Sequence, residues 1–338
     1  MEHLKDGIGQ MRGMLDRLIP ADRECLLLDF PDYANVGDSA IWLGQVHLLR
    51  MLGRRIAAIG DISRYSIETV LRDAGERVVL LSGGGNLGDV WEAHQVFRER
   101  VVAMLPRNRV VQLPQSIHFA DREREDRATA IFRQHPDFHL FARDPASLEI
   151  ARRISGDRAV MVPDMACCLP RNVRGDASAA RWDVVVVRRT DKESRCGPSA
   201  PLDVPGEKVL VTDWTSEDRG FAHSLYARLQ GIDSSRRPRL KPTLDRLVRA
   251  SANRLARYRF ERGMALLESG RAVVTDRLHA VILSWLRGVP VYYSDNAYGK
   301  IASFASEWLK DDPDVTQVPD LSDGIARALE ASASARSI

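Results

Sequence analysis

The chain has 338 residues, of which 44% are hydrophobic and 28% are charged, and its formal net charge is +3. This composition is that of a globular protein with room for two domains, and the small net charge gives no reason to expect a nucleic-acid partner. No apolar run reaches the roughly 18 residues of a membrane-spanning helix, and the four cysteines lack the spacing of a zinc site. We therefore expect a reduced, cytoplasmic protein without a bound metal or cofactor.

The first half of the chain alternates short β-branched runs with helical segments, which predicts a parallel sheet covered by helices. Residues 1–20 predict an amphipathic helix, because apolar residues such as Leu4, Met11 and Leu15 recur at helical spacing. A helix is also predicted over residues 39–52. Strands are predicted at residues 25–30, 55–60, 77–84, 109–114, 138–144 and 159–164. Their apolar runs are continuous, which is typical of strands buried on both faces.

The second half repeats this alternation after a polar segment at residues 170–181, which predicts a linker. Strands are predicted at residues 182–189, 208–214, 272–276 and 289–295. We therefore predict an α/β fold of two Rossmann-like domains, residues 1–174 and 175–338, with the last helix as a candidate to pack back on the first domain. A ligand is expected in the cleft between the domains, at the carboxyl ends of their strands, where the polar motifs fall.

Residues 235–262 form the most basic segment of the chain. From Leu244 onward the apolar spacing predicts an amphipathic helix with arginines on its outer face. A solvated helix face is the favoured interpretation, and contact with a membrane surface or an anionic acceptor is the alternative.

Polar residues follow the strands of the first half. Asn35, Asp38 and Ser39 stand between a strand and a helix, where Asp38 or Ser39 is placed to cap the helix and free helix amides attract anions. We expect Ser39 to be only a cap, whereas for Asn35 and Asp38 the structural and functional interpretations are equally open. Further on, a salt bridge between Arg143 and Asp144 at a helix start is the simplest interpretation of that pair.

A glycine-rich loop follows another strand of the first half. Gly83, Gly84 and Gly85 permit a close approach of the backbone to a ligand, with Asn86 as a polar tip, although close packing alone would also explain them. The loop is not a GxGxxG pattern with a following ribose-binding acid, and it lacks the GK[ST] of a Walker motif, so it implies no nucleotide cofactor.

The second half offers cationic side chains at its strand ends. Arg188 and Arg189 end one strand, and the alternation of side chains directs only one of them toward the cleft. Arg277 and His279 follow another strand where a helix begins, and Lys300 follows the last clear strand. Several cationic donors at strand ends and at a helix N-terminus favour an anionic ligand.

An ordered series of motifs resembles the polysaccharide pyruvyl transferase family, in its bacterial exopolysaccharide branch, over roughly residues 25–308. The motifs are NVGDSAI, LLSGGGNLGD, VVQLPQSI, FARDPAS, VPDMA, RRTDKE and TDRLHA…GVPV…YGK. The resemblance implies a GT-B-like fold, phosphoenolpyruvate as the donor and a ketal-linked pyruvate on a sugar as the product. It also implies that the donor is bound by Arg189, with Arg188 as the alternative alignment, and by Arg277 and His279.

With this chemistry, Arg189, Arg277 and Lys300 are assigned to the phosphate and carboxylate of the donor. His279 is either a phosphate ligand or the acid that protonates the enol, and Asp276 is expected to orient Arg277. Catalytic roles toward the acceptor hydroxyl, as base or as orienting group, are assigned to Asp38 and Asp89. The predicted acceptor-side and loop residues are Asn35, Gly83, Gly84, Gly85 and Asn86.

Two other functions fit the same sequence. One is a sugar-nucleotide-dependent glycosyltransferase of GT-B type, and the other is a non-catalytic protein that binds a glycan or an anion. The acceptor sugar, its carrier and the oligomeric state stay open, with a lipid-linked acceptor, a peripheral contact with the inner face of the membrane and a homo-oligomer all compatible with the sequence.

Overall fold

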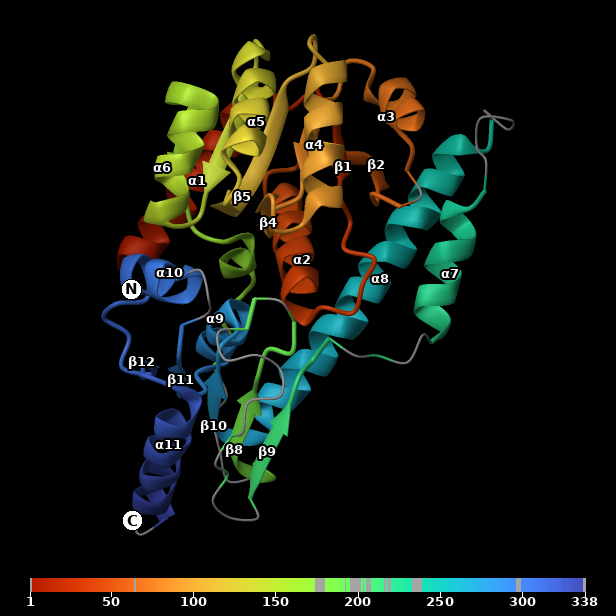
Figure 1. Ribbon diagram of the computed structural model, residues 1–338. Coiled ribbons are helices and arrows are strands. Elements are labelled where there is room, and N and C mark those ends of the chain that lie inside the picture. Colours follow the sequence, from red (N-terminus) through yellow and green to blue (C-terminus); the bar gives the residue numbers. More distant parts are fainter. Residues whose placement is uncertain are drawn as a thin grey trace.

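The computed structural model shows an α/β protein built on two parallel sheets (Figure 1). It describes residues 2–63, 65–173, 180–191, 193–194, 202, 204, 208–215, 217, 220–232, 239–295 and 299–336. Every strand pairing in this part of the chain is parallel, and the central strands are buried on both faces, as the continuous apolar runs predict.

The first sheet has the strand order β2-β1-β3-β5-β6-β7, and β4 pairs with β5 as well. Its strands are β1 (Cys25–Leu28), β2 (Ile56–Gly60), β3 (Val78–Leu81), β4 (Gly84–Gly88), β5 (Val110–His118), β6 (Phe138–Ala142) and β7 (Ala159–Met161). The second sheet has the order β12-β11-β10-β8-β9. Its strands are β8 (Trp182–Val187), β9 (Val209–Thr212), β10 (Gly270–Thr275), β11 (Val291–Tyr293) and β12 (Val315–Gln317).

The helices of the first half are α1 (Glu2–Leu18), α2 (Val36–Met51), α3 (Ile67–Ala74), α4 (Glu92–Met104), α5 (Arg122–Gln134) and α6 (Pro145–Ser155), with short 3₁₀ turns η1 (Gly156–Arg158) and η2 (Met165–Cys168). Those of the second half are α7 (Phe221–Gln230), α8 (Lys241–Glu268), α9 (Leu278–Arg287), α10 (Lys300–Trp308) and α11 (Leu321–Arg336). They alternate with the strands, as expected for parallel connections.

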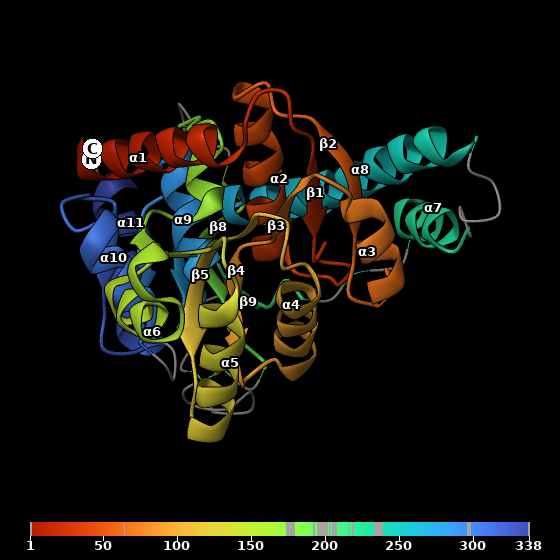
Figure 2. The same ribbon diagram turned by 90° about the horizontal axis from the view of Figure 1, so that it is seen from above.

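Two helices join the parts of the molecule that carry the two sheets. The long helix α8 runs diagonally along both (Figure 1), with Val248 and Leu255 in the core of the first sheet and Met264 and Leu267 in that of the second. Helix α1 lies across the other side of the molecule (Figure 2), with Leu4 in the core of the second sheet and its later apolar residues in that of the first. Both helices therefore help to fix the two halves against each other.

Most predicted elements are found, with differences at their ends. The glycine-rich loop is partly a strand, β4, and β12 was not expected. The last helix, α11, which we considered as packing back on the first domain, packs on β8, β10 and β11 of the second sheet. The predicted linker at residues 170–181 lies partly outside the described residues, so the boundary between residues 174 and 175 stays a prediction.

The basic helix also differs in detail from its prediction. Arg259, in the middle of α8, is buried and forms a salt bridge with Glu217 while donating to the carbonyl oxygen of Pro31. Leu247, expected on the apolar face, is 47% exposed. Arginines therefore do not all lie on the outer face of this helix, because one is used to connect α8 to the loop after β1.

Candidate functional site

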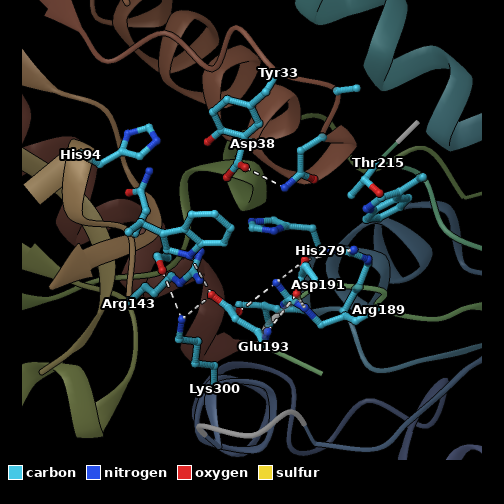
Figure 3. Close-up of a pocket in the computed structure, with 18 residues that line it drawn as sticks. Tyr33, Asp38, His94, Arg143, Arg189, Asp191, Glu193, Thr215, His279 and Lys300 are labelled. Atoms are coloured by element: carbon cyan, nitrogen blue, oxygen red, sulfur yellow. Dashed lines mark hydrogen bonds and ion pairs between the residues drawn. The ribbon is translucent and has the colours of Figure 1, made fainter. Parts of the chain in front are cut away.

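A cavity of about 400 Å³ lies where the carboxyl ends of strands from the two sheets meet (Figure 3). From the first half it is lined by Asn35, Asp38, Gly85 and Asn86, and from the second half by Arg189, Arg277, His279 and Lys300. The predicted cleft is thus present, and most of the predicted site residues share it. Arg189 lines the cavity and Arg188 does not, which is the outcome expected from side-chain alternation at the end of β8.

The loop after β1 presents Asn35 and Asp38 to the cavity. Asn35 is the N-cap of α2, because its side chain accepts from the backbone N–H of Gly37 at 3.0 Å. Its Nδ2 donates to Oδ2 of Asp38 at 2.7 Å, which fixes the orientation of that carboxylate. The prediction that Asp38 or Ser39 caps this helix was wrong, because α2 begins at Val36 and takes Asn35 as its cap.

Gly37 lets the two halves touch at the site. A methyl group added at Gly37 would stand 2.5 Å from Nδ1 of His279, so only glycine leaves room for the imidazole against the first turn of α2. His279 is the second residue of α9 and its Nε2 lies 3.5 Å from Oδ2 of the buried Asp164. This Nε2 is buried and makes no hydrogen bond within the described residues, so its contact with Asp164 is a long ion pair.

Arg277 forms a bidentate ion pair with Asp213. Its Nε and Nη2 donate to the two carboxylate oxygens of Asp213, both at 2.7 Å, and Nη2 also lies 3.3 Å from Asp191. Burial acts to raise the pKa of Asp213, but the guanidinium outweighs it and holds that pKa below its ordinary value. Arg277 is therefore rigidly oriented, as a bidentate pair requires.

Arg189 is paired as well. It donates to Asp191 at 2.9 Å and lies 2.9 Å from Oε2 of Glu193, while its backbone N–H donates to Asp276 at 2.7 Å. Burial raises the pKa of Asp276. We expected Asp276 to orient Arg277, but its carboxylate is bonded to the backbone of Arg189 instead.

Lys300 bridges the two halves across the cavity. Its Nζ lies 3.2 Å from Glu193 and donates to the carbonyl oxygen of Gly85 in the first half at 3.1 Å. The indole of Trp91, also in the first half, donates to the same Glu193 oxygen at 3.0 Å. Burial lowers the pKa of Lys300, although Glu193 acts in the opposite direction.

Arg143 is a further cation in the cavity wall. The predicted salt bridge with Asp144 was wrong, because Arg143 donates to Asp164 at 2.6 Å, and Asp144 caps α6 and accepts from Ser116. Burial acts to raise the pKa of Asp164, but His279 and Arg143 outweigh it and hold the pKa well below its ordinary value.

Only part of the glycine-rich loop at residues 83–86 lines the cavity. Asn86 accepts from Arg98 at 2.7 Å, and Gly85 leaves room for the guanidinium of Arg143, since an added methyl would stand 3.0 Å from it. Gly83 and Gly84 do not line the cavity. An added methyl on Gly83 would lie 2.6 Å from the carbonyl oxygen of Pro114, so close packing explains Gly83. Gly84 has φ of +148°, a backbone conformation that favours glycine.

Asp89 lies outside the cavity. Its carboxylate accepts from the backbone N–H groups of Ala120 and Asp121 at 2.6 and 2.7 Å. These contacts place it at the start of α5, facing a different depression of the surface. The geometry therefore gives no support to the catalytic role predicted for Asp89.

Sequence reasoning missed the acids of the second half and one ion pair of the first. Asp191 and Glu193 belong to the RRTDKE motif and Asp213 follows β9, so each had a signal in its position at a strand end. Arg98 and His94, which meet Asp29, lie within a helix and gave no such signal. Tyr298, close to the predicted Lys300, lies outside the described residues.

The site is therefore a set of preformed ion pairs rather than a group of free cations. An anion that enters the cavity must displace a carboxylate from at least one of these cations. Among the described residues no group of three or more His, Cys, Asp and Glu side chains is arranged to hold a metal ion. No helix in the described part of the chain is long and apolar enough to cross a membrane.

The fold and the site together define an α/β protein with a charged cavity at the carboxyl ends of strands from two parallel sheets. A sequence model of polysaccharide pyruvyl transferase matches residues 35–298. The chain belongs to this family, and it is therefore a transferase enzyme.

Several known proteins are similar to the chain. Pyruvyl transferase 1 of Schizosaccharomyces pombe is 29% identical over 303 residues, which make up 85% of this chain and 70% of that protein. Putative pyruvyl transferase EpsO of Bacillus subtilis is 26% identical over 322 residues, 90% of this chain and 91% of that protein. A crystal structure of an uncharacterised protein from Klebsiella pneumoniae has a TM-score of 0.54 at 17% identity, covering 91% of this chain and 97% of its own, and this likeness concerns the fold alone.

Proposed function

We propose that this enzyme transfers pyruvate from phosphoenolpyruvate to two hydroxyls of one sugar in an exopolysaccharide or its precursor. The product is a pyruvate ketal, and phosphate is released. One observation carries the proposal: cationic side chains from the second half and hydrogen-bonding side chains from the first half line a single cavity. In this proposal the two halves are domains in a GT-B-like arrangement, with the boundary near residue 174.

The donor is assigned to the second half. Phosphoenolpyruvate carries a phosphate and a carboxylate, and Arg189, Arg277 and Lys300 offer the charge-assisted donors that such groups need. His279, in the first turn of α9, lines the same cavity, where the helix dipole also favours negative charge. The donor displaces Glu193 from Arg189 and Lys300, since those contacts occupy the cations in the unliganded protein.

The chemistry follows from the donor. Protonation of C3 makes C2 an oxocarbenium-like centre, and the oxygen of one sugar hydroxyl forms a bond to it. The C2–O bond to phosphate then breaks, with the electron pair leaving on the phosphate, and the neighbouring hydroxyl closes the ketal. One hydroxyl proton balances the proton added to C3 and the other leaves with the phosphate, so no cofactor is needed. The enzyme supplies an acid, a base and charge stabilisation.

The acceptor is assigned to the first half, to Asn35, Asp38, Gly85 and Asn86. Asp38 is held by Asn35 and is placed to orient a sugar hydroxyl. A lipid-linked acceptor would bring the enzyme to the inner face of the membrane, and the exposed arginines Arg246, Arg254 and Arg257 of α8 would face its anionic surface. The protein would then act in the cytoplasm, as a monomer or a homo-oligomer.

His279 has two candidate roles that one substitution separates. In His279→Gln the side chain still donates a hydrogen bond but cannot deliver a proton at neutral pH. Weaker donor affinity with substantial turnover assigns His279 to phosphate binding, and retained donor affinity without turnover assigns it to the acid. If donor affinity and turnover are both unchanged, His279 has neither role. Donor affinity is measured by calorimetry and turnover by phosphate release.

The proposal as a whole is tested by incubating the enzyme with phosphoenolpyruvate and free, nucleotide-linked and lipid-linked glycans. Phosphate release is followed, and mass spectrometry detects a glycan that gains pyruvate less one water. Sugar nucleotides without phosphoenolpyruvate serve as the control for glycosyl transfer. Phosphate release coupled to a pyruvylated glycan is the expected result, and glycosyl transfer without any pyruvylation would contradict the proposal.

A further inference from the structure

A histidine in the first half of the cavity is backed by a buried carboxylate. His94, on α4, lines the cavity, and its Nδ1 lies 2.8 Å from Oδ1 of Asp29. An ionised carboxylate only accepts hydrogen bonds, so Nδ1 of the neutral ring must carry the proton. Nε2 is then left without a hydrogen, as a proton acceptor. None of the described residues forms a hydrogen bond with Nε2 of His94.

Asp29 is kept ionised by its surroundings. It is buried at the carboxyl end of β1 and accepts from Nη2 of Arg98 at 2.6 Å. Burial acts to raise the pKa of Asp29, but Arg98 and His94 outweigh it and hold that pKa below its ordinary value. A carboxylate that stays charged behind an imidazole fixes its tautomer and stabilises the imidazolium that forms when Nε2 takes a proton.

The backbone of Asp29 is strained. Its φ is 68°, and it is the one non-glycine residue with a positive φ in the described part of the chain. This conformation costs free energy and persists where the surrounding structure imposes it, which happens most often at functional sites. In this conformation the carboxylate meets both His94 and Arg98.

The imidazole lies on the acceptor side of the cavity. Figure 3 shows His94 on the same side as Tyr33 and Asp38, away from Lys300 and Arg189. The Tyr33 ring meets the His94 ring edge-on, with 6.0 Å between centroids. The charged and titratable groups that face the ring from inside are therefore Asp29, Arg98, Tyr33 and, beyond Tyr33, Asp38.

His94 also faces the outside. It lines a second depression at the surface, next to Trp91, which lines both cavities as well. The titratable groups on that outer side are Asp89, Glu92, His118, Asp121 and Arg124. The ring therefore stands in the wall between the reaction cavity and the surface, where a proton taken from inside can leave to solvent.

We infer that Nε2 of His94 is the base that removes the proton from the attacking sugar hydroxyl, with Asp29 as its positioning residue. The inference rests on the proposed function. As the hydroxyl oxygen bonds to C2 of the donor, its O–H bond breaks and the proton passes to Nε2. The imidazolium then releases this proton to water or to the departing phosphate, and the neutral ring is restored for the second hydroxyl. Donor binding by the second half does not involve this pair.

The test uses His94→Gln in the full chain, with His118→Gln as a matched control that alters an imidazole outside the cavity. In His94→Gln the dissociation constant of phosphoenolpyruvate should stay within about threefold, whereas transfer should fall on the order of 10²-fold or more, the usual contribution of a general base. The control should keep both values. Thermal denaturation establishes that each variant is folded.

Two further measurements separate proton transfer from a structural role. In His94→Ala, added imidazoles should restore transfer, and the restored rate should rise with the pKa of the added base. In Asp29→Asn, loss of the charge that orients the ring and stabilises the imidazolium should lower the maximal rate of transfer. Donor affinity should stay near that of the wild type.

These experiments distinguish failure of the proposed function from failure of the base assignment. If the wild type pyruvylates no glycan, the proposed function fails and the role of His94 falls with it. If the wild type is active and folded His94→Gln transfers pyruvate at the wild-type rate, only the base assignment is overturned. It is also overturned if donor affinity and transfer fall in parallel, or if imidazole restores nothing in folded His94→Ala.

Discussion

The two walls of the cavity are built differently. The second-half wall carries Arg189 and Arg277 in close ion pairs with Asp191, Glu193 and Asp213. In the first-half wall Asn35 holds Asp38 and Asp29 holds His94, so each group that faces the cavity has a second group behind it. Where many charges are paired, the wall is suited to exchange one anion for another. Where single groups are oriented, the wall is suited to place one hydroxyl and move one proton.

Asp38→Ala tests the first-half wall and should have the largest effect of the four substitutions that compare the walls. Transfer should fall on the order of 10²-fold, because a misplaced hydroxyl is no longer aligned with the reacting centre. Donor affinity should stay nearly intact. Asp89→Asn is the matched control, since Asp89 lies outside the cavity, and it should keep transfer near the wild-type rate. Phosphate release and calorimetry with phosphoenolpyruvate measure the two quantities, and a parallel loss of both in Asp38→Ala would remove the distinction between the walls.

Arg277→Lys tests the second-half wall. A lysine is a point charge and cannot reproduce the fork that Arg277 makes with Asp213. Loss of one charge-assisted contact is worth roughly 1.5–3 kcal/mol, on the order of ten- to hundredfold in donor affinity. Calorimetry with phosphoenolpyruvate measures the loss. Unchanged binding in a folded variant would take Arg277 out of the donor site.

Gly37→Ala tests the contact between the walls without removing a functional group. The added methyl would stand 2.5 Å from the His279 ring and must displace it. Transfer should fall by roughly tenfold or more, since a displacement near 1 Å is enough to misalign a reacting group. Gly9→Ala is the control, because nothing lies within 4 Å of the methyl it adds to α1. Equal activity in both variants would show that the position of His279 is unimportant.

Glu193→Gln should have the smallest effect, in the opposite direction. Glu193 lies 2.9 Å from Arg189 and 3.2 Å from Lys300, so it competes with an incoming anion for both. Removing its charge should strengthen phosphoenolpyruvate binding about two- to fivefold, because the donor no longer has to displace a carboxylate from these cations. Weaker binding would mean that Glu193 positions the cations for the donor instead of competing with it.

The sequence was sufficient for the broad fold and for part of the site. Continuous apolar runs predicted the buried strands, and polar residues at strand ends predicted the wall that carries Arg189 and Arg277. Contacts between distant segments were not predictable in this way. Arg143 pairs with Asp164 instead of its neighbour Asp144, because the carboxyl end of β6 lies next to the end of β7 and Asp144 is used as a helix cap. His94 meets Asp29 only because α4 packs beside the end of β1.

A crystal structure of the enzyme with phosphoenolpyruvate would locate the donor between the two walls. We expect its phosphate and carboxylate to contact Arg189, Arg277 or Lys300, with Glu193 moved off at least one of these cations. Asp38 and His94 should face C2 from across the cavity. Phosphoenolpyruvate bound against Asn35 and Asp38, with the ion pairs of the second half intact, would contradict this expectation.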